Sequence, residues 1–357
     1  MPRFKPETLR NVLRHLLVVA GAAPEEASIV SMFIVDAHLS GHDSHGTLSL
    51  LQYVRQMSHG EIVPGAPIEV LRETNSTLLL DGNWGFGQVV VREATLRAIQ
   101  KAHKTGNCVV SVRRSNHIGR ISDYLRMVTN EGMIAIMMAN SHGQRGLTAP
   151  WGGIEPRLST NPMGFGVPTG RIPIILDMTT TVAAAGKIAL AHNLGESVPE
   201  GWLMDSRGAT TTDPGVIFND PPGALLPLGG PAGYKGFGLG IAVEALAGAL
   251  SGAGCTDWDQ IRGGNAVFLS VINVDMFSQP KTFQQKVQSF LQRIKNSRRA
   301  PGFQEILIPG ELEERERLRR VKEEICLPKQ TWRKALETAR KLGLSWDKNQ
   351  TFWVKRG

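Results

Sequence analysis

A change in hydrophobic pattern at residues 64–67 divides this chain of 357 residues into parts of different character. Before it, apolar residues recur at helical spacing. After it, short apolar runs alternate with clusters of glycine, proline and asparagine, which is typical of strands and turns. The joint itself, Pro64-Gly65-Ala66-Pro67, is a turn sequence. We therefore expect a helical beginning followed by a mixed α/β centre.

The same periodicity predicts the individual elements. Helices are expected at residues 7–20, from residue 24, after residue 46, and at 281–296, 311–325 and 330–342. Between them, the central strands are expected at 68–71, 77–80, 108–112, 133–138, 164–167, 173–176 and 266–274, with helices near 88–103, 119–130, 181–193 and 236–251. We expect the two ends to pack together as a helical subdomain, residues 1–62 and 281–357, beside an α/β core of residues 63–280.

Composition restricts the class of partner. Hydrophobic residues make up 41% of the chain, enough for a large core in two or three subdomains. The formal charge is +8, but the densest charged run, residues 311–324, mixes both signs as a solvated helix face does. Aromatic residues, only 6% of the total, do not alternate with basic ones. We expect a phosphate-bearing cofactor and a small acidic substrate, and no nucleic acid partner.

Cysteine usage and hydropathy indicate the compartment. Cys108, Cys255 and Cys326 are far apart and follow neither a disulfide framework nor a metal-ligand spacing. No apolar stretch is long enough to cross a bilayer, and no signal peptide precedes the first helix. The sequence therefore predicts a cytoplasmic protein without a membrane segment or a metal site.

A polar segment, Gly41-His42-Asp43-Ser44-His45-Gly46-Thr47, precedes the third helix. We interpret it as a tight turn with Asp43 or Ser44 as the helix N-cap and His45 in the first turn. The helix dipole there disfavours the imidazolium, and a neutral imidazole suits proton transfer near pH 7. A capping turn with two surface histidines explains this segment equally well.

A second histidine follows a predicted strand, in Ser115-Asn116-His117-Ile118-Gly119-Arg120. Polar residues between a strand and a helix often form sites in α/β proteins. His117 offers a proton carrier and Arg120 a two-pronged anchor for a carboxylate. A structural histidine beside a solvent-facing arginine is the competing interpretation.

Further polar loops follow other predicted elements. Their backbone amides and hydroxyls suit carboxylates or phosphates, although a plain turn-rich connector is the simpler explanation. They are Asn140-Ser141-His142-Gly143, Ser159-Thr160-Asn161-Pro162, Asp177-Met178-Thr179-Thr180 and the glycine run 229–240, in which Lys235 stands at a helix start.

The familiar catalytic signatures are absent. No G-x-G-x-x-G follows a strand, no complete phosphate-binding P-loop occurs, and no G-x-S-x-G or cysteine–histidine pair is present. A Rossmann site and a nucleophilic serine or cysteine are therefore not supported. His42, Asp43 and His45 are suitable metal ligands by type, but their spacing matches no firm motif.

Taken in order, these segments resemble the type-2 malate/L-lactate dehydrogenase family over nearly the whole chain. The resemblance is closest to the hydroxycarboxylate dehydrogenase B branch, through His117-Ile118-Gly119-Arg120 and Gly223-Ala224-Leu225-Leu226-Pro227. The other matching segments are Ser40-Gly41-His42-Asp43-Ser44-His45-Gly46, Ser159-Thr160-Asn161-Pro162, Asp177-Met178-Thr179-Thr180, Gly186-Lys187, Tyr234-Lys235-Gly236-Phe237-Gly238-Leu239 and Ile306-Leu307-Ile308-Pro309-Gly310-Glu311.

The resemblance implies both a fold and an activity. The fold would be a mixed, largely antiparallel sheet with flanking helices, as in L-sulfolactate dehydrogenase, and not a Rossmann fold. The activity would be hydride transfer between NAD or NADP and C2 of a small 2-hydroxy or 2-oxo acid, such as malate, lactate or a 2-oxoglutarate-like acid. Family members are typically homodimers, so a homodimer is implied here.

The resemblance also implies site residues. His45 and His117 would line the reacting carbon; we favour His117 as the proton carrier and His45 as the group that polarises the carbonyl. The substrate would contact Ser44, Tyr53, Arg120 and Thr160. The dinucleotide would contact Ser141, Asp177, Met178, Thr179, Tyr234, Lys235, Pro309, Gly310 and Glu311.

Two departures from the family stand out. Many members carry an arginine that holds the substrate carboxylate where this chain has Ser49, and Arg120 is expected to replace it. Ala185 stands where an acidic residue is common.

Three alternatives remain from the sequence: a reductase of a cyclic imine 2-carboxylate, a metal-dependent hydrolase built on His42, Asp43 and His45, and a non-catalytic binding protein. The sequence does not distinguish among acids, between NAD and NADP, or between the two directions of reaction.

Overall fold

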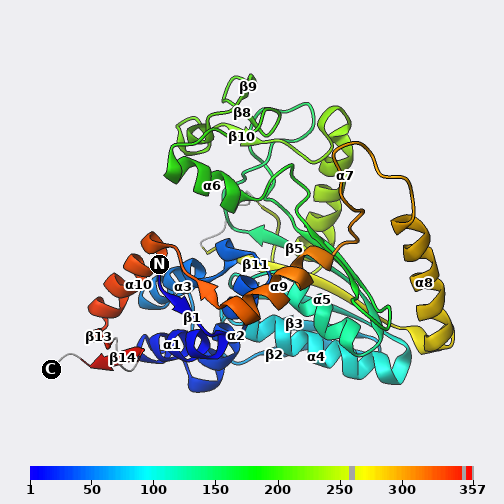
Figure 1. The fold of residues 1–357 in the computed structure, drawn as a ribbon, viewed down its shortest axis with the longest axis horizontal. Coiled ribbons are helices and arrows are strands. Elements are labelled where there is room, and N and C mark those ends of the chain that lie inside the picture. Colours follow the sequence, from blue (N-terminus) through cyan, green and yellow to red (C-terminus); the bar gives the residue numbers. More distant parts are fainter. Residues whose placement is uncertain (257–261, 348–350, 356–357) are drawn as a thin grey trace.

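A computed structural model describes residues 1–256, 262–347 and 351–355 (Figure 1). Its centre is a seven-stranded sheet in the order β2-β3-β4-β11-β5-β6-β7. Only β3 and β4 run parallel; the other neighbouring pairs are antiparallel. The predicted mixed, largely antiparallel sheet is therefore confirmed. Its strands are β2 (Glu69–Glu73), β3 (Thr77–Asp81), β4 (Asn107–Ser115), β5 (Met133–His142), β6 (Met163–Val167), β7 (Ile174–Met178) and β11 (Gly264–Asn273).

Helices cover both faces of this sheet. On one face, α4 (Gly87–Thr105) and α5 (Ile121–Asn130) bury their apolar sides against β3, β4, β5 and β11, and these elements form the largest core cluster. On the other face lies α7 (Tyr234–Val243), which continues as a π-helical turn, Glu244–Ala249. The predicted central helices and strands all occur within a few residues of their expected positions.

The two ends of the chain share a second core. Helices α1 (Pro6–Val19), α2 (Pro24–Leu39), α3 (Thr47–Ser58) and α10 (Lys329–Lys341) contribute to it. Strand β1 (Arg3–Phe4) pairs with β12 (Ile325–Cys326), and the indole of Trp353 donates to the Val12 carbonyl at 3.0 Å. Residues from both ends of the chain thus contribute to one core.

Two details of the C-terminal part differ from expectation. The segment after residue 280 is not only helical, because β13 (Leu344–Asp347) and β14 (Phe352–Lys355) form a hairpin. Helix α8 (Pro280–Lys295) contributes nothing to the shared core, whereas α9 (Glu311–Glu323) packs on α2. Where the helical subdomain begins and ends stays a prediction.

A smaller lobe lies above the sheet in Figure 1. It holds α6 (Ala185–Leu194) and a three-stranded sheet of β8 (Leu203–Met204), β9 (Thr210–Thr211) and β10 (Ala224–Leu225). Short 3-10 turns complete the described chain: η1 (Asp43–His45), η2 (Pro214–Phe218), η3 (Gly230–Ala232) and η5 (Val274–Met276). None of the described helices has the length and apolarity needed to cross a membrane.

Candidate active site

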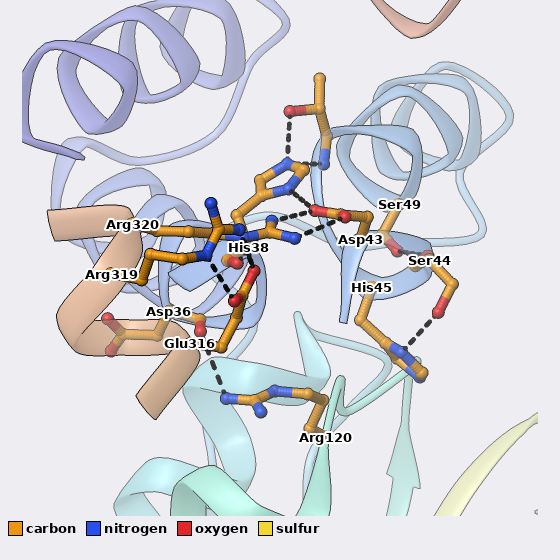
Figure 2. A network of polar contacts seen from close by, with 11 residues as sticks. Asp36, His38, Asp43, Ser44, His45, Ser49, Arg120, Glu316, Arg319 and Arg320 are labelled. Carbon is orange, nitrogen blue, oxygen red and sulfur yellow. Dashed lines mark hydrogen bonds and ion pairs between the residues drawn. The ribbon is translucent and has the colours of Figure 1, made fainter. Parts of the chain in front are cut away.

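The polar segment at residues 41–47 forms a 3-10 turn that precedes the third helix. Helix α3 begins at Thr47 with Gly46 at its N-cap position, and no side chain of the described residues caps it. The predicted N-cap role of Asp43 or Ser44 is therefore wrong, and His45 lies before the helix instead of in its first turn. The carboxylate of Asp43 is turned away from the helix, because His38 and Arg320 hold it by hydrogen bonds of 2.6 and 2.7 Å (Figure 2).

His45 and His117 lie together although 71 residues separate them in the chain. Their rings stack at 5.6 Å between centroids with 17° between their planes. His45 comes from η1, and His117 from the loop that follows β4. That loop rests on the start of α4, where even a methyl group at Gly87 would lie 2.2 Å from the carbonyl oxygen of Asn116.

A tyrosine fixes the orientation of the His117 ring. The Tyr53 hydroxyl lies 2.6 Å from Nδ1 of His117, and the Gln88 amide donates to the same hydroxyl oxygen at 2.7 Å. Tyr53 is 1% exposed, so this contact is shielded from water. With Nδ1 engaged, Nε2 of His117 is the ring nitrogen left for a reacting group.

Both imidazoles are held neutral near pH 7. Burial lowers the pKa of His117 to about 4. Burial is also the largest cause for His45, whose pKa is lowered to about 3, and the positive fields of His117, Arg120 and His42 add to it. The predicted neutral imidazole therefore arises from desolvation and not from a helix dipole.

A cavity of about 320 Å³ lies between the start of α5, the end of β7 and the loop before α9. Arg120, Asp177, Pro309 and Gly310 are among its lining residues. The Arg120 side chain is only 4% exposed and is ion-paired with Asp123, so it is not the free carboxylate anchor expected from the sequence. Its Nε, however, is buried and has no hydrogen-bond partner among the residues that the structure describes, which leaves one charged donor unused.

One asparagine connects Ser141 with the histidine loop. The Asn265 amide donates to Oγ of Ser141 at 3.3 Å, and its carbonyl oxygen accepts from the Ile118 amide at 3.1 Å. Asn265 thus bridges Ser141, at the end of β5, and the segment that carries His117.

The remaining predicted site residues have contacts of their own. Ser44 contacts Nδ1 of His45 at 3.2 Å, and the Thr160 carbonyl accepts from the Thr180 amide at 3.0 Å. Asp177 accepts from the Ser122 amide at 2.8 Å. Within the described chain, no hydrogen bond or ion pair connects the following predicted cofactor residues with either histidine: Met178, Thr179, Tyr234, Lys235 and Glu311.

Four residues of the arrangement were not singled out from the sequence: His38, Gln88, Asn265 and Arg320. Each acts through a partner that is distant in the chain or hidden on a helix face; Arg320, for example, is 277 residues from Asp43. Arg320 lies in the mixed-charge run 311–324, where its role cannot be distinguished from that of its neighbours.

The ligands of the alternative metal site do not converge. His42 pairs with Glu313 at 3.5 Å, Asp43 with His38 and Arg320, and His45 stacks on His117. Among the described residues, no three histidine, cysteine or acidic side chains form a group able to hold a metal ion. The geometry therefore does not favour the hydrolase alternative.

Comparison with known proteins identifies the family. The family model "Malate/L-lactate dehydrogenase" matches residues 4–335. A malate dehydrogenase from Pyrococcus abyssi is 39% identical over 320 residues, covering 87% of this chain and 86% of that protein. Hydroxycarboxylate dehydrogenase B of Escherichia coli is 32% identical, covering 98% of this chain and 97% of that protein.

The fold comparison agrees. The structure of sulfolactate dehydrogenase from Methanocaldococcus jannaschii superimposes with a TM-score of 0.85 at 35% identity, covering 96% of this chain and 98% of that one. A match of this extent in both sequence and fold leaves one conclusion: the chain belongs to the malate/L-lactate dehydrogenase family.

Proposed function

We propose that this member of the family, a 2-hydroxyacid dehydrogenase, transfers a hydride between a nicotinamide cofactor, NAD or NADP, and C2 of a small 2-hydroxy or 2-oxo acid. The observation that carries the proposal is the stacked pair of neutral imidazoles, one of them held by Tyr53 so that Nε2 is free. A neutral imidazole beside the reacting carbon can take the hydroxyl proton as the hydride leaves.

The residues around the cavity fit an anionic, hydroxyl-rich cofactor. The unused Nε donor of Arg120 suits a phosphate or carboxylate oxygen, and the exposed carboxylate of Asp177 suits a ribose hydroxyl. Pro309 and Gly310, which also line the cavity, would contact the same molecule. When bound, the nicotinamide ring supplies or accepts the hydride; the protein supplies orientation and charge.

His117 is the proton carrier in this proposal. In the oxidation of a hydroxy acid, Nε2 of His117 takes the hydroxyl proton. The Nδ1–H then donates to the Tyr53 oxygen, which stabilises the imidazolium that forms. His45, on the adjacent ring plane, would hydrogen-bond the substrate oxygen and polarise it.

Ser44 and Thr160 are proposed to complete the substrate pocket. Ser44 contacts His45, and the start of α6 faces it, because a methyl group at Gly186 would lie 3.4 Å from Cβ of Ser44. The positive end of the helix dipole at this helix start favours a negative group such as the substrate carboxylate.

The test is a panel of pyruvate, oxaloacetate, 2-oxoglutarate and phenylpyruvate, each with NADH and NADPH, followed by absorbance of the reduced cofactor. The expected result is oxidation of one nicotinamide with at least one acid. His117→Ala should lower turnover by about 100- to 10,000-fold while reduced-cofactor fluorescence still reports binding. Near wild-type turnover by that variant would remove His117 from the role, and turnover of a cyclic imine 2-carboxylate alone would favour the imine reductase.

We propose further that the protein acts as a homodimer in the cytoplasm, as the family resemblance implies. Its three cysteines, Cys108, Cys255 and Cys326, are free thiols, which suits a reducing compartment. Light scattering coupled to gel filtration tests the dimer, and a single-protomer mass would contradict it.

A further inference from the structure

His38 holds the turn that carries His45 by contacts at both ends of that turn. The imidazole is 1% exposed and bridges the two ends of the turn: Nδ1 lies 2.6 Å from the Asp43 carboxylate, and Nε2 accepts from the Thr47 amide at 2.9 Å. Because Nε2 accepts a backbone N–H, Nδ1 carries the proton and donates to Asp43. The ring lies so close to Gly46 that a methyl group there would be 2.3 Å from it.

Arg320 fixes the other side of the same carboxylate. Its guanidinium donates to both oxygens of Asp43, at 2.7 and 3.1 Å, and to the His38 carbonyl at 2.8 Å (Figure 2). Burial alone would raise the pKa of Asp43, but the hydrogen bonds from His38 and Arg320 outweigh it and hold that pKa well below its usual range. Asp43 is therefore an anion held by two residues through three hydrogen bonds.

Helix α9, which carries Arg320, connects this turn with the candidate cofactor cavity. The helix follows Gly310, a residue of the cavity wall, and runs along the turn from there. Glu313 pairs with His42 at 3.5 Å, and Glu316 packs so that a methyl group at Gly41 would lie 3.2 Å from its Cγ. Successive turns of one helix thus contact the cavity and residues 41–43.

We propose that Arg320 is a positioning residue for His45, because its contacts with Asp43 and His38 fix the position of the turn that carries His45. Helix α9 thereby connects the cavity wall with the histidine pair. The inference rests on the proposed function for the role of His45, but the geometric part stands without it. A shift of the His45 ring by about 1 Å would cost about 100-fold in rate, because the reacting groups would lose alignment.

Arg320→Ala and Arg319→Ala form a matched pair. Both residues belong to α9 and pair with Glu316, but Arg319 turns outward to Glu323 and does not reach Asp43. We expect Arg320→Ala to lower kcat by about 10- to 100-fold with cofactor affinity little changed, and Arg319→Ala to match the wild type. Arg320→Lys, which keeps the charge but loses the fork, should recover part of the loss.

A second measurement does not depend on turnover. The rate at which diethyl pyrocarbonate modifies His45, followed by mass spectrometry of the peptide that contains it, should rise in Arg320→Ala and not in Arg319→Ala. Near-ultraviolet circular dichroism shows whether each variant is folded. If Arg320→Ala fails to fold, Arg320→Lys is measured in its place. Equal kcat and equal His45 modification in both alanine variants would overturn the proposal, as would a loss of cofactor affinity as large as the loss of kcat. If the wild type turns over no acid, the proposed function fails while the modification experiment still tests the positioning.

Discussion

At the scale of single residues, the two stacked histidines are alike in charge and different in what holds them. His117 is fixed by the Tyr53 hydroxyl, which is itself fixed by Gln88. Within the described chain, the hydrogen-bond partner of His45 Nδ1 is the exposed Ser44 side chain alone. A base must keep one nitrogen aimed at the substrate throughout the reaction. The arrangement therefore suits His117 better than His45 for proton transfer.

The pH dependence of the reaction follows from the lowered pKa of His117, about 4 against an ordinary value of 6.5. In the oxidation of a hydroxy acid, kcat/KM should be unaffected by this group down to about pH 5 and should fall as pH drops through about 4, because the base becomes protonated. In the reduction of an oxo acid, kcat/KM should rise as pH is lowered from 8, because the proton donor is then more populated. Initial-rate profiles in both directions check this, and an oxidation limb centred near 6.5 would contradict it.

At the scale of elements, the position of His117 depends on how closely α4 meets the loop after β4. Gly87, at the first position of α4, leaves room for the backbone: a methyl group there would be 2.2 Å from the Asn116 carbonyl oxygen and 2.5 Å from that of His117. Backbone cannot move aside as a flexible side chain can. The glycine therefore sets the depth at which the histidine loop sits.

Gly87→Ala should displace this loop. We expect turnover to fall by about 100-fold and the free energy of unfolding by about 1–3 kcal/mol. Gly238→Ala is the control, because a methyl group there, in the middle of α7, meets no atom of the described residues within 4 Å. That variant should be as stable as the wild type or gain up to about 1 kcal/mol. Thermal unfolding and initial rates check both, and equal behaviour of the two variants would contradict the role of Gly87.

Periodicity predicted the central sheet and its helices because those elements depend on neighbours a few residues apart. It missed the hairpin β13–β14 and the pairing of β1 with β12, because short strands at the chain ends carry little periodic signal. The histidine-bearing segments were recognisable as unusual polar motifs. Their partners were not, since His38, Gln88 and Arg320 join the site only through the fold.

At the scale of the whole molecule, the last residues of the described chain complete the core that the two chain ends share, here called the terminal core. Trp353 is 2% exposed, lies against Trp332 and Trp346, and donates to the Val12 carbonyl. Its removal would leave a large cavity between α1 and α10. The stability of the N-terminal helices therefore depends on a residue more than 300 positions away.

Trp353→Ala should lower the free energy of unfolding by about 3–5 kcal/mol. Trp353→Phe keeps most of the aromatic ring and should lower it less. About 1 kcal/mol of the Trp353→Phe loss should come from the hydrogen bond to the Val12 carbonyl, which phenylalanine cannot donate. Trp151→Ala, at a residue 48% exposed, is the control and should change stability by about 0.5 kcal/mol or less. Urea denaturation followed by circular dichroism checks the order of the three. A Trp353→Ala variant as stable as the control would show that the terminal core closes without this indole.

The antiparallel pairing of β1 with β12, together with the grip of Arg320 on Asp43, has a consequence for protein synthesis. A nascent chain carries both histidines long before the ribosome adds α9, yet until that helix emerges the turn bearing His45 is held by His38 without Arg320. Contacts of such long sequence separation form late in folding. Full catalytic competence would then require the synthesis of α9, and products truncated before that helix would be released with lowered activity.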